Sequence, residues 1–472
     1  MIRTELGDEL FWRAIHTFVQ NHAHQTVETI DLIRAIERAT GRNLRSLFDQ
    51  YVFRGGHPDY KVAYSWDGDS NLAKLTVTQT QVKDGDTSST SGLFDLRIPM
   101  GFGYVQDKGE PEVTLFTVRV HEREQSFFFP LAKKPDFVSF DVGNHYLKTV
   151  KLEYPMAELK AQLQHDPDPL SRIEAASALA KKGTLEAVNA LTEVLQAEPF
   201  WGVRVEVAEQ LASIKLDQAA EGLLQGLQDT NANVRRAVAE ALGEVKTLES
   251  YEALKALVEK GDPSYYVEAA AIRALGKVGA SGVETKAGGK NGEGESNEKK
   301  TLELLEAILK ERSGWNEVVR SGAIAALSQF KTSEDALNLV LPYTEAGVPQ
   351  ALRLAAIRAL GPISVSQSKP NVERILDRLE VISRESFFLT QVSVVAALGA
   401  METPRAMTVL QALADHTADG RVRRRAEESV QLVQKTLGKD QAVQKLQQEI
   451  DELKKANQEL KSRLEALEAK NR

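Results

Sequence analysis

The chain has 472 residues, 42% of them hydrophobic and 27% charged, and this length and composition predict about two to four globular domains. Its formal net charge of −8 at pH 7 excludes the basic surface that attracts nucleic acids and anionic membranes, so we expect neither as a partner. The chain has no cysteine, no apolar run long enough for a membrane span and no signal-peptide zones, which favours a soluble protein in a reducing, cytoplasmic compartment.

Residues 1–54 are predicted to form short helices, because apolar residues recur there at helical spacing. One helix is already under way at the second residue, and another ends at Gly41, which acts as a C-terminal cap. Three short helices bury little surface against one another, so we expect some of their faces to contact structure that this chain does not contain. The start is abrupt, and we expect the natural protein to extend upstream of Met1. The bulky apolar residues of these faces are Phe11, Trp12, Phe18, Leu32, Ile36, Leu47, Phe48 and Tyr51.

Residues 55–153 change from a helical to an alternating pattern. Short runs such as YKVAYSW, KLTVTQTQ, TLFTVRVHE and DFVSFDV are rich in β-branched and aromatic residues and are separated by Gly, Asp, Asn, Ser or Pro. Their alternation leaves one face polar, as antiparallel sheets allow. We therefore expect a small antiparallel β-sandwich.

Residues 157–437 repeat a unit of about 32 residues made of two helices. Such a period is typical of an α-solenoid, in which each helix pair buries its apolar stripe only by stacking on its neighbours. Alanines in the second helix of each pair allow close approach, while the first helix supplies bulkier side chains. Most register positions are 31 to 33 residues apart: Leu179, Leu211, Leu242, Leu275, Leu327, Leu360, Leu398 and Val430.

An arginine stands seven residues before most register positions, with Glu268 and Gln391 as the exceptions. Six residues before the first three arginines are the acidic residues Asp166, Glu198 and Asp229. An acid in the turn and an arginine early in the second helix can form charged hydrogen bonds from one repeat to the next, and we favour this structural ladder over an anion site. The spacing and the A-x-A-L-G endings resemble the bacterial HEAT-like repeat. The arginines are Arg172, Arg204, Arg235, Arg320, Arg353 and Arg423.

The spacing between two register positions, Leu275 and Leu327, is longer than the other spacings in the solenoid. The excess, residues 281–300, is rich in glycine and charge and is expected to be a disordered loop.

Residues 440–472 are predicted to form a coiled coil, with Asn457 at an a position favouring a parallel two-stranded homodimer over a single solvated helix. Its a and d residues are Val443, Leu446, Ile450, Leu453, Asn457, Leu460, Leu464 and Leu467.

No catalytic, cofactor-binding or metal-ligating residue can be assigned in this chain. The string nearest to a zinc motif runs from His121 to Gln125, lies in a predicted strand and lacks the second histidine that H-E-x-x-H requires. His22 and His24 are two residues apart and point in different directions. No phosphate-binding loop, nucleophile elbow or dinucleotide fingerprint is present, and there is no thiol nucleophile. We expect no cofactor in this chain.

The first 60 residues nevertheless resemble the end of the catalytic domain of gluzincin zinc aminopeptidases, peptidase family M-one. That family shows L-R-x-x-L-G-x-x-x-F, then D-L-x-x-A-x-E-x-x-x-G-x-x-L-x-x-F-F-x-x-W, then G-x-P leading into a β-sandwich. Tyr51 stands where that family usually has tryptophan. Bacterial members that continue into HEAT-like repeats extend the resemblance over most of the chain. The matching residues are Leu6, Gly7, Phe11, Asp31, Leu32, Glu37, Gly41, Leu44, Phe48, Gly56 and Pro58.

The resemblance implies that zinc and all catalytic residues of a full-length member lie N-terminal to this sequence. We therefore expect a multidomain α and β chain that acts as a structural and protein-interaction region, with a protein or peptide on its solenoid face. The alternative is a stand-alone HEAT-repeat scaffold without peptidase activity, for which a transcription-factor subunit that kept this architecture and lost its zinc site is a precedent. A HEAT-like bilin lyase is a remoter possibility, which the helical start and the sandwich do not fit.

Overall fold

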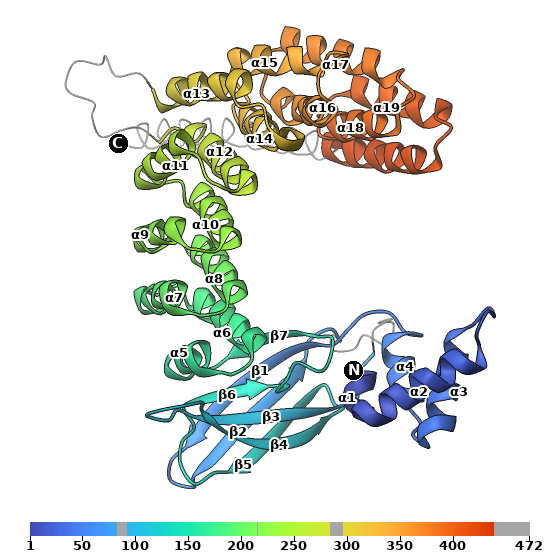
Figure 1. Cartoon of the computed structure of the whole chain (residues 1–472), viewed down its shortest axis with the longest axis vertical. Helices are drawn as coiled ribbons and strands as arrows, with labels where there is room; N and C mark the ends of the chain where they lie inside the picture. The colour runs from blue at the N-terminus through green and yellow to red at the C-terminus, as the bar shows by residue number, and fades with distance from the viewer. Residues whose placement is uncertain (83–91, 215, 284–295, 439–472) are drawn as a thin grey trace, which may run out of the picture. The chain divides into compact units, whose positions relative to one another are not determined.

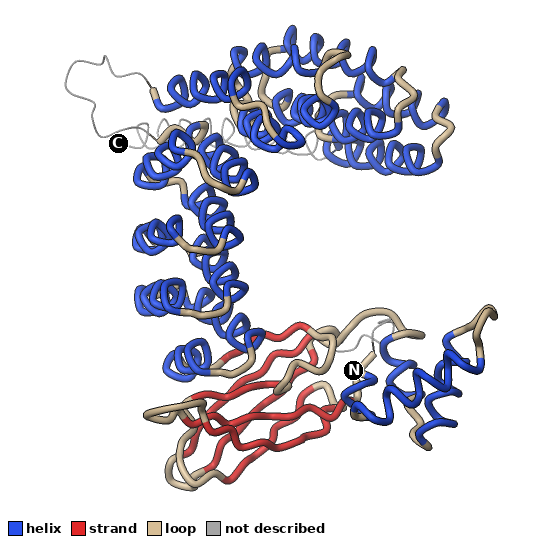
Figure 2. The backbone as a smooth tube through the Cα atoms, viewed as in Figure 1, coloured by secondary structure: helices blue, strands red, loops and turns tan. Residues whose placement is uncertain are grey.

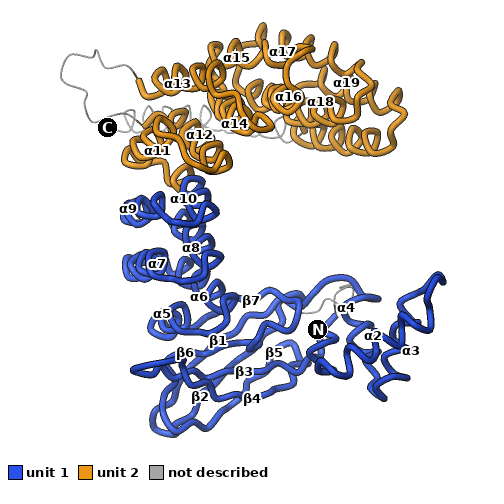
Figure 3. The backbone as a smooth tube through the Cα atoms, in the orientation of Figure 1, with its two compact units in different colours: residues 1–241 blue, residues 242–472 orange. Residues whose placement is uncertain are grey.

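The structure is a computed structural model that describes residues 1–82, 92–214, 216–283 and 296–438 (Figure 1). It divides into two compact units, residues 1–241 and 242–472, coloured separately in Figure 3. The boundary falls inside helix α10 (Ala232–Val245). No helix in the described part of the chain combines the length and the apolarity needed to cross a membrane. The predicted coiled coil, residues 440–472, lies outside the described residues.

The first unit opens with four helices around a small apolar core. Glu28 and Asp31 form a reciprocal capping box at the start of α3, and the predicted cap at Gly41 is confirmed by its left-handed φ of 69°. Trp12 and Val19 remain more than half exposed, and their seven-residue spacing places them on one face of α2. The helices are α1 (Ile2–Leu6), α2 (Asp8–Asn21), α3 (Thr29–Thr40) and α4 (Arg45–Tyr51). The core consists of Leu6, Ala14, Ile33, Ile36 and Phe48.

Two small β-sheets follow these helices (Figure 2). One has four strands in the order β5-β2-β1-β7, and the other has three in the order β4-β3-β6. Aromatic rings join them, with the Phe102 and Phe129 centroids 4.9 Å apart and those of Tyr60 and Phe140 5.2 Å apart. The strands are β1 (Asp59–Asp67), β2 (Leu72–Gln79), β3 (Leu96–Tyr104), β4 (Glu112–Val120), β5 (Glu124–Pro130), β6 (Phe137–Phe140) and β7 (Thr149–Glu153).

The edge strand β7 differs from the expected all-antiparallel arrangement, because it pairs in parallel with β1. Parallel neighbours require a crossover connection, and here the chain leaves β6 in the other sheet before it reaches β7. Asp141 and Asn144 turn this connection with positive φ values of 58° and 46°. The remaining strand pairs are antiparallel.

A buried polar network joins the sheets to the first solenoid helices. The Lys148 Nζ donates to Asp141 Oδ2 at 2.7 Å, and both side chains are at most 3% exposed. The Ser139 hydroxyl donates to the Asp166 carboxylate, so a strand residue meets the turn before the second solenoid helix. Burial raises the pKa of Glu174 to about 7, although Lys148 opposes the shift. Removing a partner here would leave a buried charge unpaired, so the network fixes the sheets against the solenoid.

The solenoid of the first unit is made of paired helices that start as the pattern predicts. Asp168 caps α6 by accepting from the Leu170 amide, and Thr184 caps α7 by accepting from the Ala187 amide. The elements are α5 (Met156–His165), α6 (Pro169–Lys182), α7 (Leu185–Ala197), α8 (Trp201–Ser213), α9 (Asp217–Leu224) and the 3₁₀ turn η1 (Gln225–Gln228).

The second unit continues the same pairing. A last helix covers residues 420–438 of the described chain. The other elements are α11 (Leu248–Lys260), α12 (Tyr265–Gly279), α13 (Asn297–Glu311), η2 (Trp315–Glu317), α14 (Val318–Leu327), α15 (Glu334–Val340), η3 (Leu341–Thr344), α16 (Gln350–Ser364), α17 (Lys369–Ser383), α18 (Phe388–Gly399) and α19 (Pro404–His416).

The predicted disordered insert, residues 281–300, needs a correction at its C-terminal end. Residues 297–300 form the first turn of α13, because the Ser296 hydroxyl accepts from the Lys299 amide and caps the helix. Asn297 is buried and donates to the Val283 carbonyl at 2.8 Å. Most of the insert, residues 284–295, lies outside the described residues.

Candidate functional site

The described residues contain no group of three or more histidine, aspartate or glutamate side chains placed to hold a metal ion. The string from His121 to Gln125 was expected within a strand, but its first three residues form the turn between β4 and β5. The reason is local: Gln125 Oε1 accepts from the His121 and Glu122 amides at 2.7 and 3.0 Å and closes the turn. The two histidines after α2 do not meet either, since His24 lies in a left-handed turn beyond His22.

Two ladder arginines of the first unit, Arg172 and Arg204, each contact two turns. Arg172 Nη1 donates to the Asp166 carbonyl at 2.6 Å, and its Nη2 donates to the Glu198 carboxylate of the next repeat at 3.0 Å. Arg204 repeats the geometry with the Glu198 carbonyl and a bidentate pair to Asp229 at 2.7 and 3.0 Å. These ion pairs are nearly buried, with side-chain exposures between 4% and 11%. Such pairs fix the spacing of successive repeats.

The arginines at the remaining ladder positions also contact carbonyls or carboxylates, but with different partners. Arg235 donates to the carbonyls of Asp229 and Thr230, and Arg423 donates to the Thr417 carbonyl. Arg353 forms a bidentate pair with Glu385, 32 residues further on, at 2.8 and 2.6 Å. Arg320 instead pairs with Glu317, three residues before it. The Asp166 carboxylate binds Ser139 rather than an arginine, because no repeat precedes it.

The two exceptions to the arginine pattern keep a cross-repeat contact by other means. Glu268 stands at the arginine position and accepts from Arg312, which follows the next helix, so the charges of this pair are exchanged. Gln391 provides a neutral version, since its Oε1 accepts from the Thr417 hydroxyl at 3.1 Å. The positions are therefore conserved in geometry within this chain while their chemistry changes.

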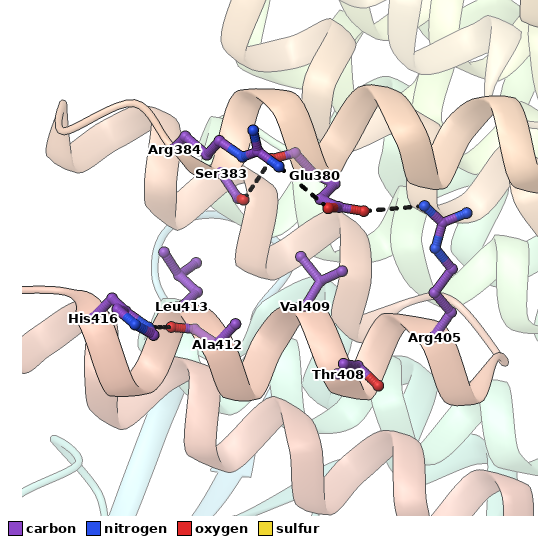
Figure 4. A pocket seen from close by; sticks show the side chains of 9 residues that line it. All are labelled: Glu380, Ser383, Arg384, Arg405, Thr408, Val409, Ala412, Leu413 and His416. Carbon is purple, nitrogen blue, oxygen red and sulfur yellow. Dashed lines mark hydrogen bonds and ion pairs between the residues drawn. The ribbon is translucent and has the colours of Figure 1, made fainter.

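A hollow of about 460 Å³ lies between α17 and α19 in the second unit (Figure 4). Arg405 closes one end and pairs with Glu373, Asp377 and Glu380, and these three carboxylates raise its pKa. His416 lies at the other end, with its Nδ1 2.7 Å from the Ala412 carbonyl. Val409 and Leu413 form the apolar floor. Because the charged groups of this hollow already neutralise one another, it offers little to a charged ligand.

A second hollow, of about 590 Å³, lies over the inner helices α12, α14 and α16. Small residues line much of it, together with Val318, Leu354 and Pro362, and its charged lining residues are Arg273 and Arg358. Tyr266 lines one end and contacts the ring of Trp315, with centroids 6.2 Å apart. Both aromatic side chains are more than half exposed. We call these lining residues, together with Trp315, the inner hollow.

The inner hollow was not singled out from the sequence, and the recurring aromatic residues of the solenoid do not identify it, because none of them lines it. Aromatic residues recur ten positions before the register leucines, as Trp201, Tyr265 and Phe388 do. The structure places these positions at the beginnings of the second helices of their repeats. Trp201 and Tyr265 are 42% and 47% exposed, whereas Phe388 is half-buried beneath the Arg421 guanidinium.

Comparisons with known proteins give three kinds of likeness. A family model described as HEAT repeats matches residues 156–229 and 220–287. Transcription initiation factor TFIID subunit 2 of Drosophila melanogaster is 23% identical over 208 residues, which are 40% of this chain and 17% of that protein. Tricorn protease-interacting factor F2 of Thermoplasma volcanium is 30% identical over 113 residues, which are 24% of this chain and 14% of that protein.

Among solved structures, aminopeptidase A of Legionella pneumophila in complex with aspartic acid matches with a TM-score of 0.56. The match covers 91% of this chain and 55% of the other at 15% sequence identity, so the likeness concerns the fold. The chain spans about half of that aminopeptidase and less than a fifth of the two curated relatives. The expected resemblance to an M-one aminopeptidase with HEAT-like repeats is confirmed.

The ladder predicts a large difference between buried and exposed arginines. Replacing Arg204→Met leaves the nearly buried Asp229 carboxylate without its charged partner, and we expect the free energy of unfolding to fall by about 3 kcal/mol. Urea unfolding followed by circular dichroism measures this loss. The matched control is Arg424→Met, whose pair with Glu428 is exposed and whose removal should leave the unfolding midpoint unchanged. Equal effects of the two substitutions would contradict the structural role of the ladder.

Proposed function

We propose that this chain is the C-terminal, non-catalytic region of a zinc metallo-aminopeptidase and acts there as a structural and protein-interaction region. The observation that carries the proposal is the fold match to aminopeptidase A over 91% of the chain, which leaves almost half of that enzyme unmatched. A fold alone does not establish an activity, so the enzymatic part of the proposal depends on what lies upstream. In the full-length protein, zinc would supply a metal-bound water that attacks the N-terminal peptide bond.

The exposed apolar face of the first helices supports this proposal. Trp12 and Val19 on α2 are 56% and 57% exposed, and Phe53, just after α4, is 54% exposed. Large apolar residues on a small helical group are costly to leave in water. A catalytic domain preceding these helices would cover them. The two β-sheets, packed through aromatic rings, would then form the β-sandwich that follows the catalytic domain in this family.

A second candidate is a stand-alone scaffold that binds a protein or peptide and has no peptidase activity. The similarity to a transcription initiation factor subunit and to a protease-interacting factor favours it, because the first name describes a subunit of an assembly and the second a protein that interacts with another protein. Stacked repeats with an extended inner face suit either role. The two candidates differ only in whether a zinc site accompanies the chain.

Zinc content and the upstream coding sequence separate these candidates. We expect the purified 472-residue chain to contain no stoichiometric zinc by atomic absorption and to leave leucyl-p-nitroanilide intact. The coding frame upstream of Met1 is expected to encode H-E-x-x-H, a glutamate about 20 residues later and Y-x-K-G. An upstream frame without these motifs would favour the scaffold. Bound zinc with anilide turnover by the chain alone would contradict both candidates.

We also propose that the heptads of residues 440–472 join two copies of the chain. Parallel pairing would place Asn457 against its counterpart, where the two amides can hydrogen-bond. Light scattering after gel filtration should give about twice the chain mass of 52.1 kDa. The double substitution Leu453→Asp and Leu460→Asp should return the monomer mass, because it places charges in the coil interface. A monomeric parent chain would contradict the proposed dimer.

A further inference from the structure

The connection between β6 and β7, residues 141–148, contacts three parts of the first unit. It leads into β7, against which α6 packs (Figure 1). Asn144 Nδ2 donates to Asp168, the N-cap residue of α6, at 2.8 Å. The Tyr146 hydroxyl donates to Glu5 of α1. The connection therefore links the sheets, the first helices and the beginning of the solenoid.

Three aspartates at this place are stabilised as anions. Asp141, Asp166 and Asp168 each accept hydrogen bonds from two donors, and such donors favour the charged form of a carboxyl group. Their charges are therefore held in place by the fold. The donors are Lys148 and the Tyr146 amide for Asp141, the Ser139 hydroxyl and the Asp168 amide for Asp166, and Asn144 and the Leu170 amide for Asp168.

Glu174, on α6, is a carboxyl group at the same place without this support. Its Oε2 is buried and has no hydrogen-bond partner in the described part of the chain. Burial raises the pKa of Glu174 to about 7; Lys148 opposes this shift, and the three aspartates add to it. Lys148 already binds Asp141 and Asn144, so it is shared among several acceptors. A negative charge on Glu174 is therefore costly.

The excess of negative charge around Glu174 calls for a cation or a proton, because an unpaired buried charge is unfavourable. A metal ion needs several ligands, and no three acidic or histidine side chains of the described residues are placed to hold one. A proton needs a single oxygen, and the unpartnered Oε2 of Glu174 provides it. The arrangement thus fits proton uptake better than metal binding.

The other titratable and charged groups of the elements packed against α6 do not share this situation. Histidine changes charge near neutral pH, but His145 lies toward α1, with its Nδ1 3.4 Å from Thr4 Oγ1. His165 at the end of α5 and Glu209 on α8 are exposed. Tyr154, after β7, stays neutral because burial raises its pKa. The paired groups are Arg172 with Glu198, Lys134 with Glu158, Lys61 with Glu153, Lys160 with Glu186, Arg204 with Asp229, and Glu206 with Gln210.

We propose that Glu174 and the connection 141–148 form a proton-dependent joint between the sheets and the solenoid of the first unit. With a proton on Glu174, α6 stays packed on the connection. Loss of this proton adds a negative charge beside Asp141 and Asp168, and α6 then separates more readily from the sheets. The folded chain holds the proton more tightly than the unfolded chain does. The stabilisation is therefore fully present below about pH 4.5 and is lost as the pH rises through about 7.

Hydrogen exchange of the full chain, followed by mass spectrometry at pH 6 and pH 8, tests this inference. After correction for intrinsic exchange rates, we expect the opening of α6 to be about tenfold more favourable at pH 8. This is the change that linkage gives for a carboxyl pKa raised from about 4.5 to about 7. Glu174→Gln, which keeps the shape and cannot ionise, should remove the pH dependence. In infrared spectra, the band of a protonated carboxyl should weaken between pH 6 and pH 8 in the parent and be missing from Glu174→Gln.

Two variants serve as controls for the exchange measurement. Glu193→Gln makes the same change on the exposed side of α7, and His145→Gln removes the histidine of the connection. Both should keep the tenfold change. Equal opening of α6 in the parent at the two pH values would overturn the inference, as would a tenfold change that persists in Glu174→Gln or disappears in His145→Gln.

The infrared measurement on the parent decides the question even where Glu174→Gln does not fold, since a carboxyl band that does not change between pH 6 and pH 8 would also overturn the joint. The joint goes beyond the proposed interaction role, because it belongs to the fold of the chain itself. None of these measurements requires a catalytic domain upstream. Their outcome is therefore independent of the zinc and coding-frame measurements.

Discussion

The close approach of neighbouring inner helices is the constraint on which the solenoid of the second unit depends. At three of the A-L-G endings, a glycine of one helix faces an alanine of a helix in the next repeat, and at the last, Gly399 faces Ser429. An added Cβ on Gly361 would lie 2.4 Å from the Ala397 carbonyl oxygen, and one on Gly276 would lie 2.8 Å from the Ala326 Cα. A larger side chain would have to push the helices apart, because close-packed interiors leave no room for it. The charged ladder then fixes the spacing between turns.

This close approach also accounts for the inner hollow. Where these helices meet through glycine and alanine, small residues such as Gly322, Ala325 and Ala355 line the hollow. Arg273, Arg358 and Tyr266 also line it, and the Trp315 ring contacts Tyr266. The outer helices α17 and α19 differ, because there Arg405 is neutralised by three carboxylates. Arg358, on α16, instead donates to the neutral Ser393 hydroxyl at 3.1 Å.

The periodic features of the fold could be predicted from the sequence, because the same pattern of apolar and small residues recurs in each repeat. The register leucines are buried, and Gly41 caps its helix with a left-handed conformation. The parallel pairing of β7 could not be predicted, since alternation within a strand does not say which neighbour it meets. The predicted disordered insert included the first turn of α13, because the capping residue Ser296 stands inside a glycine-rich, charged segment.

The candidate site was harder to predict than the fold. Arg358 and Tyr266 belong to helices separated by a long insert, and nothing in the local sequence brings them to one hollow. The left-handed turn has no glycine at Asn316 or Glu317, and of the two only asparagine is a residue type that favours this conformation. The ladder positions were visible as a spacing, but the exchanged pair of Glu268 and Arg312 became apparent only in three dimensions.

The most direct test of the close-approach constraint is the stability of Gly361→Ala, measured by urea unfolding of the full chain. The added methyl group meets the Ala397 backbone, so the account predicts a loss of about 1–3 kcal/mol, even though alanine favours helices. Gly420→Ala is the control, since an added Cβ there meets nothing within 4 Å and its backbone conformation is ordinary. A Gly361→Ala chain as stable as the parent would contradict the account.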